Sequence, residues 1–502
     1  MNGTANGHAA KAHLPLSYVV SRCAETPDGL AFTDAQPCHL QLHGTATGLQ
    51  IAATAHAADP EAPDGDGAGP AVVFRCEAKQ LMRAGPTTAL LCVPGGELFA
   101  LRGDDAASMD VLVARAEQAT KDAAGASPFE ARTEGSSAEM YFHYYGMLMH
   151  QQNMLQDYTR TGTYYSAVLQ NALDFFGSAV MDVGAGSGIL SLFAAQAGAR
   201  KVYAVEASDM ALYAERLARA NPAIGSRVEV LHCMVEDARV PEKVDVLISE
   251  PMGTLLLNER MLESYIAARD KFLKPGGRMF PTFGRIHVAL FRDEVLHAEV
   301  AAKSAFWANG SFYGVDISAL LGDATEAYFA QVVVDAFSPA VLCSATATRT
   351  IDFRTVTEDE LHDVHIPLEV TATSTGQCHG LACWFDVAFD GTSQQVWLST
   401  APGLPTTHWF QLRCVLQRPI EVQAGTVVFG SLRLVAHRRQ SYDIHVRLVG
   451  CDGGVSEGKL DLKEPYYRQM TPQGWVGAAG GAAGGPAAGD GGWGEFANEG
   501  GE

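Results

Sequence analysis

The stretch Ala179–Ser191, AVMDVGAGSGILS, decides the fold of the region around it. Residues 179–183 form an apolar run of strand length, and residues 189–197 form a run of helix formers after three alternating glycines. Further strand patterns follow at 202–205 and 244–249, spaced as in β-α-β units. This alternation predicts an α/β, Rossmann-like domain with a parallel, doubly wound sheet.

The glycine turn in this stretch carries the residues of a nucleotide site. Gly184, Gly186 and Gly188 let the backbone approach a ligand and direct amides at it. Glu206 ends the next strand, where its carboxylate is placed to accept hydrogen bonds from ribose hydroxyls. The spacing G-x-G-x-G, preceded by Asp182, favours S-adenosylmethionine over a dinucleotide, which needs an amide cradle for its pyrophosphate. The structural alternative is a tight strand-to-helix turn that binds no ligand.

Two glutamates follow in the segment SEPMGTLLLNERMLESY, Ser249–Tyr265. Glu250 stands at the end of a predicted strand and Glu259 lies across a short loop. Alone, Glu250 is explained as a loop-end acid and Glu259 as solvated helix surface. Together they suit a guanidinium, which stays charged at neutral pH and is a weak nucleophile. Two carboxylates fix its plane and draw charge from the attacking nitrogen, and in-line positioning lowers the barrier further. The pair predicts methyl transfer to arginine; lysine does not require such a clamp.

Composition narrows the class of protein. The formal net charge of −21 argues against direct nucleic-acid binding and suits a basic partner. No run approaches the roughly 20 apolar residues of a membrane span, and the first residues lack the pattern of a secretory signal, so an intracellular location is expected. The ten cysteines are scattered, and Cys378 and Cys383 alone make a poor zinc site. No metal is predicted.

Composition also divides the chain into regions. Short β-like runs between turns, closed by a helical pattern, indicate a small β-domain at the start, and many short β runs in the second half indicate a sandwich or barrel. The Gly/Ala-rich acidic end predicts disorder. The expected regions are a small β-domain at 1–125, a linker at 126–137, a Rossmann-like domain with N-terminal helices at 138–281, a β-rich substrate domain at 282–475 and a disordered tail at 476–502.

Several motifs together resemble one enzyme family. DVGAGSGILS, VYAVEAS, the paired glutamates and the triplet Thr407–Trp409 resemble the signature motifs of protein arginine methyltransferases. Within that family, Tyr141–Asn171 and the motifs AAQAGARKVYAVEAS and WLSTAP resemble the coactivator-associated, type I branch. The resemblance runs from about residue 134 to about residue 467. Thr254–Leu257 departs from the more aromatic residues of animal members, which suggests a plant or algal form.

The resemblance implies an architecture and an activity. The β-rich region is expected to be a β-barrel, interrupted at about 300–330 by a helical dimerisation arm that docks a second subunit. The first β-domain resembles a pleckstrin-homology-like module. The implied enzyme uses S-adenosylmethionine, releases S-adenosylhomocysteine, and gives monomethylarginine and asymmetric dimethylarginine. The implied partners are arginine-containing proteins, with histone H3 and RNA-binding proteins foremost, and a second copy of the chain. The implied location is nucleus and cytoplasm.

The resemblance also implies roles for individual residues, several of which agree with the chemistry above. Glu236, which follows the strand-like run Val228–Leu231, is placed to meet the adenine amino group. The expected catalytic residues are Glu250, Glu259, His408 and Asp157, the last two as a proton relay. The expected cofactor-binding residues are Gln151, Arg160, Asp182, Gly184, Gly186, Glu206, Glu236 and Ser264. The expected substrate pocket consists of Tyr141, Tyr145, Met154, Met261 and Trp409, for which simple core packing is the alternative.

Two other functions compete with this interpretation. A methyltransferase for small molecules or nucleic acid bases is the first, although base-directed enzymes usually carry an amide and an aromatic residue where this chain has Ser249–Met252. A non-catalytic scaffold that keeps the fold is the second. The presence of both clamp carboxylates and of Arg160 disfavours it.

Overall fold

The computed structural model describes residues 13–26, 29–45, 48–55, 72–76, 81–92, 98–124, 129 and 132–468. The chain divides into two compact units, residues 1–131 and 132–502. Each unit has a hydrophobic core of its own. No helix within the described part of the chain is long and apolar enough to cross a bilayer.

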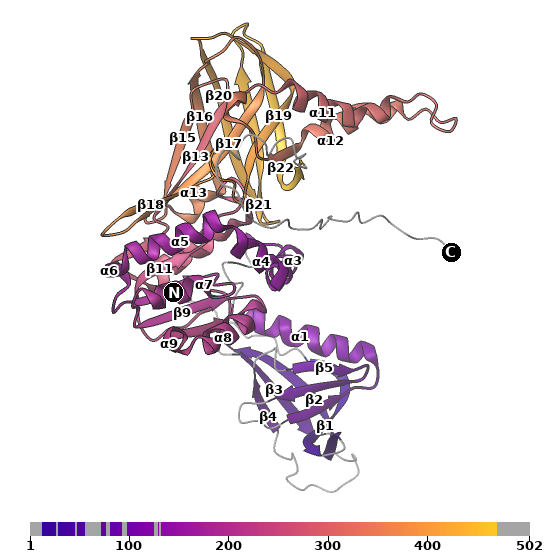
Figure 1. Ribbon diagram of the computed structural model, residues 1–502. Helices are drawn as coiled ribbons and strands as arrows, with labels where there is room; N and C mark the ends of the chain where they lie inside the picture. The colour runs from indigo at the N-terminus through magenta and orange to yellow at the C-terminus, as the bar shows by residue number, and fades with distance from the viewer. Residues whose placement is uncertain are drawn as a thin grey trace, which may run out of the picture. The chain divides into compact units, whose positions relative to one another are not determined.

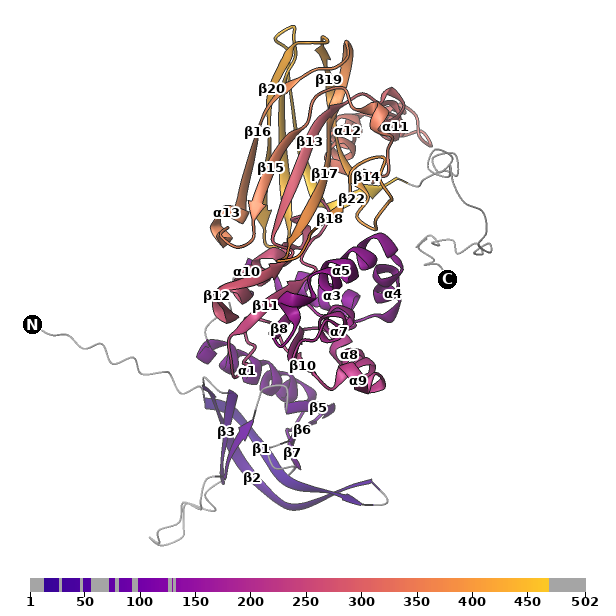
Figure 2. The same cartoon turned by 60° about the vertical axis from the view of Figure 1, so that its left-hand side comes forward.

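The first unit is an antiparallel sheet packed against one helix (Figures 1 and 2). Seven strands run in the order β4-β3-β2-β1-β7-β6-β5. Helix α1 (Ala106–Ala124) buries Met109, Leu112 and Ala116 in the core of the sheet. A small β-domain closed by a helix is therefore confirmed, and its likeness to a pleckstrin-homology module stays a prediction. The strands are β1 (His13–Thr26), β2 (Gly29–Thr45), β3 (Gly48–Ala55), β4 (Val72–Cys76), β5 (Leu81–Gly85), β6 (Thr88–Cys92) and β7 (Leu98–Arg102).

The second unit begins with a parallel sheet of five strands in the order β10-β9-β8-β11-β12. Strand β8 lies at its centre, and all five of its residues are buried, as its unbroken apolar run predicts. The predicted strands 179–183 and 244–249 are confirmed residue for residue as β8 and β11. The strands are β8 (Ala179–Val183), β9 (Lys201–Glu206), β10 (Val228–His232), β11 (Val244–Ser249) and β12 (Leu273–Phe280).

Helices surround this sheet and confirm the Rossmann-like prediction. Helix α3 starts at Gly135, within the range 126–137 that the sequence predicts as a linker, because Arg132 and the residues after it already pack in the second unit. The helices are α3 (Gly135–Tyr145), α4 (Leu148–Gln156), α5 (Tyr158–Gln170), α6 (Ala172–Phe175), α7 (Ile189–Gln196), α8 (Met210–Ala220), α9 (Pro222–Gly225) and α10 (Met261–Phe272), with a 3₁₀ turn at Asn258–Arg260.

A ten-stranded sheet follows and forms the predicted barrel. Its order is β15-β13-β17-β19-β14-β22-β21-β20-β16, with β18 paired to β17. The edge strands β15 and β16 contact each other, so the sheet nearly closes. Burial alternates along β16, as expected for a strand with one face inside a barrel. The strands are β13 (Phe283–Phe291), β14 (Gln331–Asp335), β15 (Ala347–Asp352), β16 (Asp363–Thr371), β17 (Gly376–Asp390), β18 (Gln395–Ser399), β19 (Gln411–Val422), β20 (Val427–His437), β21 (Ser441–Val449) and β22 (Val455–Tyr467). Helix α13 (Glu358–His362) and a 3₁₀ turn at Pro339–Val341 lie between strands.

An arm leaves the barrel between β13 and β14 (Figure 1). It consists of α11 (Glu294–Ser304), 3₁₀ turns at Ala305–Ala308 and Ser318–Leu320, and α12 (Leu321–Phe329). Its base packs against the barrel through Leu296, Val300 and Phe329. The predicted helical arm at about 300–330 is present. The tail predicted at 476–502 lies outside the described residues.

Candidate active site

The glycine turn after β8 is a narrow cradle. Gly184, Gly186 and Gly188 have φ values of +70°, +54° and +79°, the left-handed region that favours glycine. A Cβ atom on Gly186 would lie 2.9 Å from Oε1 of Gln151, and one on Gly184 would lie 2.8 Å from the terminal methyl of Met261. The turn therefore needs glycine for its conformation and for its close neighbours. Gln151 is tied to it, since its Oε1 accepts a hydrogen bond from the amide of Ser187 at 3.2 Å.

Glu206, at the end of β9, is bonded directly to this turn. Its Oε2 accepts from the amide of Gly186 at 2.8 Å. Its Oε1 accepts from the amide and the hydroxyl of Ser208, at 2.7 Å and 2.6 Å. These three donors fix a buried carboxylate at the carboxyl edge of the sheet, where ligands of such folds bind. Sequence reasoning missed Ser208, although the motif VEAS contained it.

Asp182 lies below the turn and is fully buried. Its Oδ2 accepts from the hydroxyl of Ser191 at 2.7 Å, and its Oδ1 has no hydrogen-bond partner among the described residues. Burial raises the pKa of Asp182 to about 7. An acceptor that is buried and unmatched calls for a donor from a ligand.

Glu236 and Ser264, both predicted to face adenine, are brought together by a residue that the sequence analysis did not single out. The hydroxyl of Ser264 donates to Oε1 of Glu236 at 2.8 Å. Nη2 of Arg132 donates to the same oxygen at 2.8 Å and to Oγ of Ser264 at 2.7 Å. Nothing in the local sequence marks Arg132, because it precedes the first helix of the unit and shares no motif with its partners.

Arg160 and Glu250 form an ion pair at the end of β11. Nη2 of Arg160 lies 2.9 Å from Oε2 of Glu250, and both side chains are largely buried. Oε1 of Glu250 is buried and accepts no hydrogen bond from the described residues. The second carboxylate oxygen of Glu250 is therefore available to a guanidinium ligand.

Glu259 is held by tyrosines. Oε2 accepts from the hydroxyl of Tyr145 at 2.7 Å. Burial raises the pKa of Glu259 to about 7, with a contribution from the negative charge of Glu250, and Tyr145 and Tyr141 oppose that rise. Burial and the charges of Glu259, Glu206 and Glu250 raise the pKa of Tyr141 well above its usual range. One tyrosine thus senses both clamp glutamates and the predicted ribose ligand.

The loop that carries Glu259 has an unusual backbone. Leu255, Leu256, Glu259 and Arg260 all have positive φ, at +56°, +70°, +72° and +56°. Each such conformation costs roughly 1–3 kcal/mol in a residue other than glycine and persists only where the surroundings enforce it. Buried leucines and the contacts of Arg260 enforce it here. Strain of this kind gathers at functional sites.

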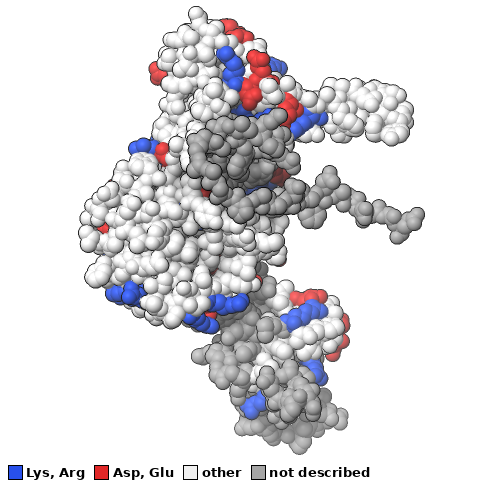
Figure 3. All heavy atoms as spheres, in the orientation of Figure 1, with Lys and Arg blue, Asp and Glu red and all other residues white. Residues whose placement is uncertain are grey.

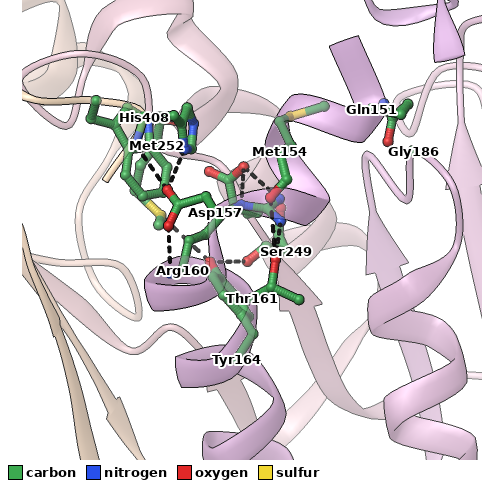
Figure 4. A network of polar contacts seen from close by, with 12 residues as sticks. Gln151, Met154, Asp157, Arg160, Thr161, Tyr164, Gly186, Ser249, Met252 and His408 are labelled. Carbon is green, nitrogen blue, oxygen red and sulfur yellow. Dashed lines mark hydrogen bonds and ion pairs between the residues drawn. The ribbon is translucent and has the colours of Figure 1, made fainter. Parts of the chain in front are cut away.

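Asp157 and His408 meet beside this loop (Figure 4). Nδ1 and the amide of His408 lie 2.8 Å and 2.9 Å from Oδ2 of Asp157, whose Oδ1 also caps α5 through the amide of Arg160. Burial tends to raise the pKa of Asp157, but the hydrogen bonds from His408 and Arg160 hold it below its usual value. The predicted pairing of these two residues is present in the structure.

The remaining predicted residues differ in position. Met261 lies over Gly184, and Met154 is half-buried on α4, near Arg160 in Figure 4. Trp409 is 4 % exposed and donates from Nε1 to the carbonyl of Met252 at 3.0 Å, so it anchors the segment after Glu250 and presents little surface of its own.

Comparisons with known proteins match this geometry. A model of the arginine methyltransferase oligomerization subdomain matches residues 283–449, and one of ribosomal protein L11 methyltransferase matches residues 163–280. The "Probable histone-arginine methyltransferase CARM1" of Oryza sativa subsp. indica is 58 % identical over 360 residues, covering 70 % of this chain and 68 % of the relative. This chain belongs to the protein arginine methyltransferase family.

Other family members agree with this assignment. The "Probable histone-arginine methyltransferase 1.3" of Arabidopsis thaliana is 56 % identical over 360 residues, which is 70 % of this chain and 67 % of that protein. Among solved structures, protein arginine methyltransferase 10 of Arabidopsis thaliana has a TM-score of 0.59 and 33 % identity, over 64 % of this chain and 100 % of the other. The PRMT1 enzyme–prozyme complex of Trypanosoma brucei, solved with AdoHcy, has a TM-score of 0.58 and 31 % identity, over 63 % and 99 %. The similarity to plant proteins agrees with the departure at Thr254–Leu257.

Proposed function

We propose that this arginine methyltransferase transfers methyl groups from S-adenosylmethionine to arginine side chains of histones. One observation carries the proposal: two buried glutamates, Glu250 and Glu259, adjoin the glycine turn, and Glu250 keeps one carboxylate oxygen without a partner among the described residues. That arrangement suits a planar cation with several N–H donors. The relatives named as histone-arginine methyltransferases support the choice of substrate.

The residues around the glycine turn fit S-adenosylmethionine, whose sulfonium supplies an activated methyl group. Glu206 would hold the ribose, Glu236 and Ser264 would face the adenine, and Arg160 and Gln151 would hold the methionyl end. Two features support this fit: the close approach at Gly186, which leaves no room for a side chain, and the unmatched buried Oδ1 of Asp182. The family member solved with AdoHcy, the demethylated product, supports it too.

The chain's own residues would bind, orient and deprotonate the substrate. Glu250 and Glu259 hold the guanidinium so that one nitrogen points at the methyl group. Glu259 must be ionised to do so, and the arriving positive charge favours its ionised form. The attacking nitrogen becomes acidic as its bond to carbon forms, so a weak base suffices to remove its proton. Asp157 and His408, 2.8 Å apart, offer a route for that proton to solvent, because the His408 side chain is 31 % exposed.

The product would be monomethylarginine followed by asymmetric dimethylarginine, which makes the enzyme type I. Asymmetric dimethylation needs room for a methylated nitrogen to return to the same attack position. Met154 and Met261 are flexible thioethers that yield to an added methyl group. Their presence on both sides of the clamp sequence supports type I.

A homodimer is the proposed assembly. The arm exposes Phe306, Phe312 and Tyr313, the last to 94 %. A broad region in the middle of the face drawn in Figure 3, over the helices of the parallel sheet, has almost no charged side chains. Helices α3 to α5 and the turn after α6 expose the apolar side chains Met140, Tyr144, Leu148, Met149, Tyr158, Tyr165, Leu173 and Phe176. An arm seated on those helices of a second copy would cover both surfaces.

Histone substrates place the enzyme in the nucleus. RNA-binding proteins as further substrates, and a cytoplasmic pool, belong to the same proposal and rest on the family resemblance alone.

A methyl-transfer assay tests the proposed activity. Purified full-length protein is incubated with labelled S-adenosylmethionine and a histone H3 tail peptide, and the product is located by mass spectrometry. We expect methylation on arginine in the wild-type peptide and none in a peptide whose arginines are all replaced by lysine. Equal labelling of the two peptides would refute arginine specificity, and labelling of neither peptide, or of free histones, would refute the function.

A further inference from the structure

Arg132 and three partners form a buried group of alternating charges behind the predicted adenine site. Nε of Arg132 lies 3.0 Å from Oε2 of Glu263, and Nη2 lies 2.8 Å from Oε1 of Glu236. Arg260 lies 2.8 Å from the other oxygen of Glu263. The four side chains are at most 5 % exposed. Two arginines balance two glutamates, which is what makes burial of four charges tolerable.

Arg132 fixes the carboxylate of Glu236 in one orientation. Both of its partners, Arg132 and Ser264, donate to the same oxygen, Oε1. No donor within the described residues reaches Oε2. The free oxygen is therefore the one that remains for a ligand, and rotation of the carboxylate would break two hydrogen bonds.

Arg132 is itself held from several sides before any ligand arrives. Its carbonyl accepts from Nη1 of Arg260 at 3.0 Å, and the amide of Glu134 donates to the carbonyl of Arg438 at 2.8 Å. Two residues of the β20–β21 turn thus anchor the segment, since Nη2 of Arg438 also donates to the carbonyl of Thr133 at 3.4 Å. A guanidinium held in this way is a pre-formed part of the site.

We propose that Arg132 is a positioning residue that gives this enzyme its selectivity for the adenine amino group. A guanidinium at hydrogen-bonding distance favours the ionised form of a carboxylate. Ionised Glu236 accepts hydrogen bonds only, so it welcomes the amino group of adenine and repels the oxo group that hypoxanthine carries at the same position. The inference rests on the proposed function, because it assigns an adenosyl cofactor to this site.

Calorimetry with two nucleoside thioethers tests the role. Full-length protein is titrated with S-adenosylhomocysteine and with S-inosylhomocysteine, which differ only in that amino or oxo group. We expect wild type to prefer the adenosyl compound by at least about 30-fold, because a site built to accept from N–H rejects an analogue without it. In Arg132→Gln we expect adenosyl affinity to fall at least about tenfold while inosyl affinity changes little, so the preference drops to about threefold or less.

Further variants separate positioning from simple stability. Arg132→Lys keeps the charge and should retain part of the preference. Arg438→Gln loosens the same segment without touching Glu236 and should leave the preference unchanged. Should Arg132→Gln fail to fold, Arg132→Gln/Glu263→Gln keeps the buried charge balanced and carries the same expectation.

The outcomes distinguish this inference from the function on which it rests. An equal loss of affinity for both compounds in the Arg132 variants, or a preference that survives in Arg132→Gln, overturns the positioning role. Failure of wild type to bind either compound overturns the proposed cofactor instead.

Discussion

Arg160 and Glu250 are joined by a 2.9 Å contact between Nη2 and Oε2, and both side chains are buried. The pair links a residue expected to hold the cofactor to one expected to hold the substrate. Arg160 bonds to one oxygen of Glu250 and leaves the other unmatched within the described chain, so the pair orients Glu250 without occupying it fully. Cofactor and substrate sites therefore share a wall.

Replacing Glu250 by glutamine should abolish methyl transfer. An amide cannot accept from a guanidinium through two anionic oxygens, and we expect the rate to fall at least about 100-fold, in line with the loss of a transition-state contact of about 3 kcal/mol. Cofactor affinity, measured by calorimetry, should stay within a few-fold of wild type, because Arg160 retains its charge. Turnover close to wild type would refute the clamp role of Glu250.

Activity should rise with pH through about 7. Burial raises the pKa of Glu259 to about 7, and only the ionised carboxylate clamps a guanidinium. Tyr145→Phe removes a hydrogen bond that lowers this pKa, so the midpoint of the kcat/KM profile should move to higher pH. Tyr144→Phe is the control, because no hydrogen bond to Glu259 is found for its hydroxyl. A midpoint that is the same in all three proteins would contradict the assignment to Glu259.

The same pKa makes a stability prediction. In the unfolded chain Glu259 titrates near 4.5, and in the folded protein near 7, so the folded state binds more protons between these values. Its contribution to stability is present below about pH 4.5 and is lost as pH rises to 7. Glu259→Gln should therefore raise Tm relative to wild type at pH 8 more than at pH 5, as measured by calorimetry on the ligand-free protein. A constant difference across this range would contradict it.

A single methyl group on Gly186 should weaken cofactor binding at least about tenfold. The added Cβ would lie 2.9 Å from Gln151, in the cradle that a ligand enters, and the φ of +54° adds strain. Gly177→Ala is the matched control, since Gly177 has a φ of +73° and nothing within 4 Å of its Cβ position. That control should lose about 1–2 kcal/mol of stability with cofactor affinity retained. Equal affinities in the two variants would contradict the cradle.

Removing the aromatic tip of the arm should give a monomer with little activity. The test variant replaces Phe306, Phe312 and Tyr313 by serine, and sedimentation measures its mass. A control variant replaces Val427 and Phe429, which are exposed on the barrel, and should stay dimeric. A monomeric arm variant with full activity would separate assembly from catalysis.

The product should be asymmetric dimethylarginine. Met154→Phe would crowd the place of the first methyl group and should shift the product toward monomethylarginine, with a trace of the symmetric form. Met149→Phe, on the same helix and 69 % exposed, should change nothing. Amino-acid analysis of a methylated substrate measures all three products. Mainly symmetric product from wild type would overturn type I and leave the family assignment intact.

Much of this protein follows from its sequence alone. The parallel sheet was predictable because AVMDVGAGSGILS combines a buried strand, a glycine turn and a helix start, which only a few local conformations satisfy. The two glutamates were identifiable because arginine chemistry needs paired carboxylates and the motif spaced them around one loop. These are local signals, carried by residues that are close in the chain.

Tertiary structure decided what depends on distant contacts. The positive φ values at Glu259 and Arg260 follow from packing around the loop and not from propensity, which disfavours them. Arg132 meets Glu236 across 104 residues, and Arg160 meets Glu250 across 90, and no local pattern encodes either pair. Burial then raised the pKa of Glu259, a property of its surroundings and not of its own residue type. The sequence alone therefore determined which groups are present, and the fold decided which of them share a charge, a proton or a ligand.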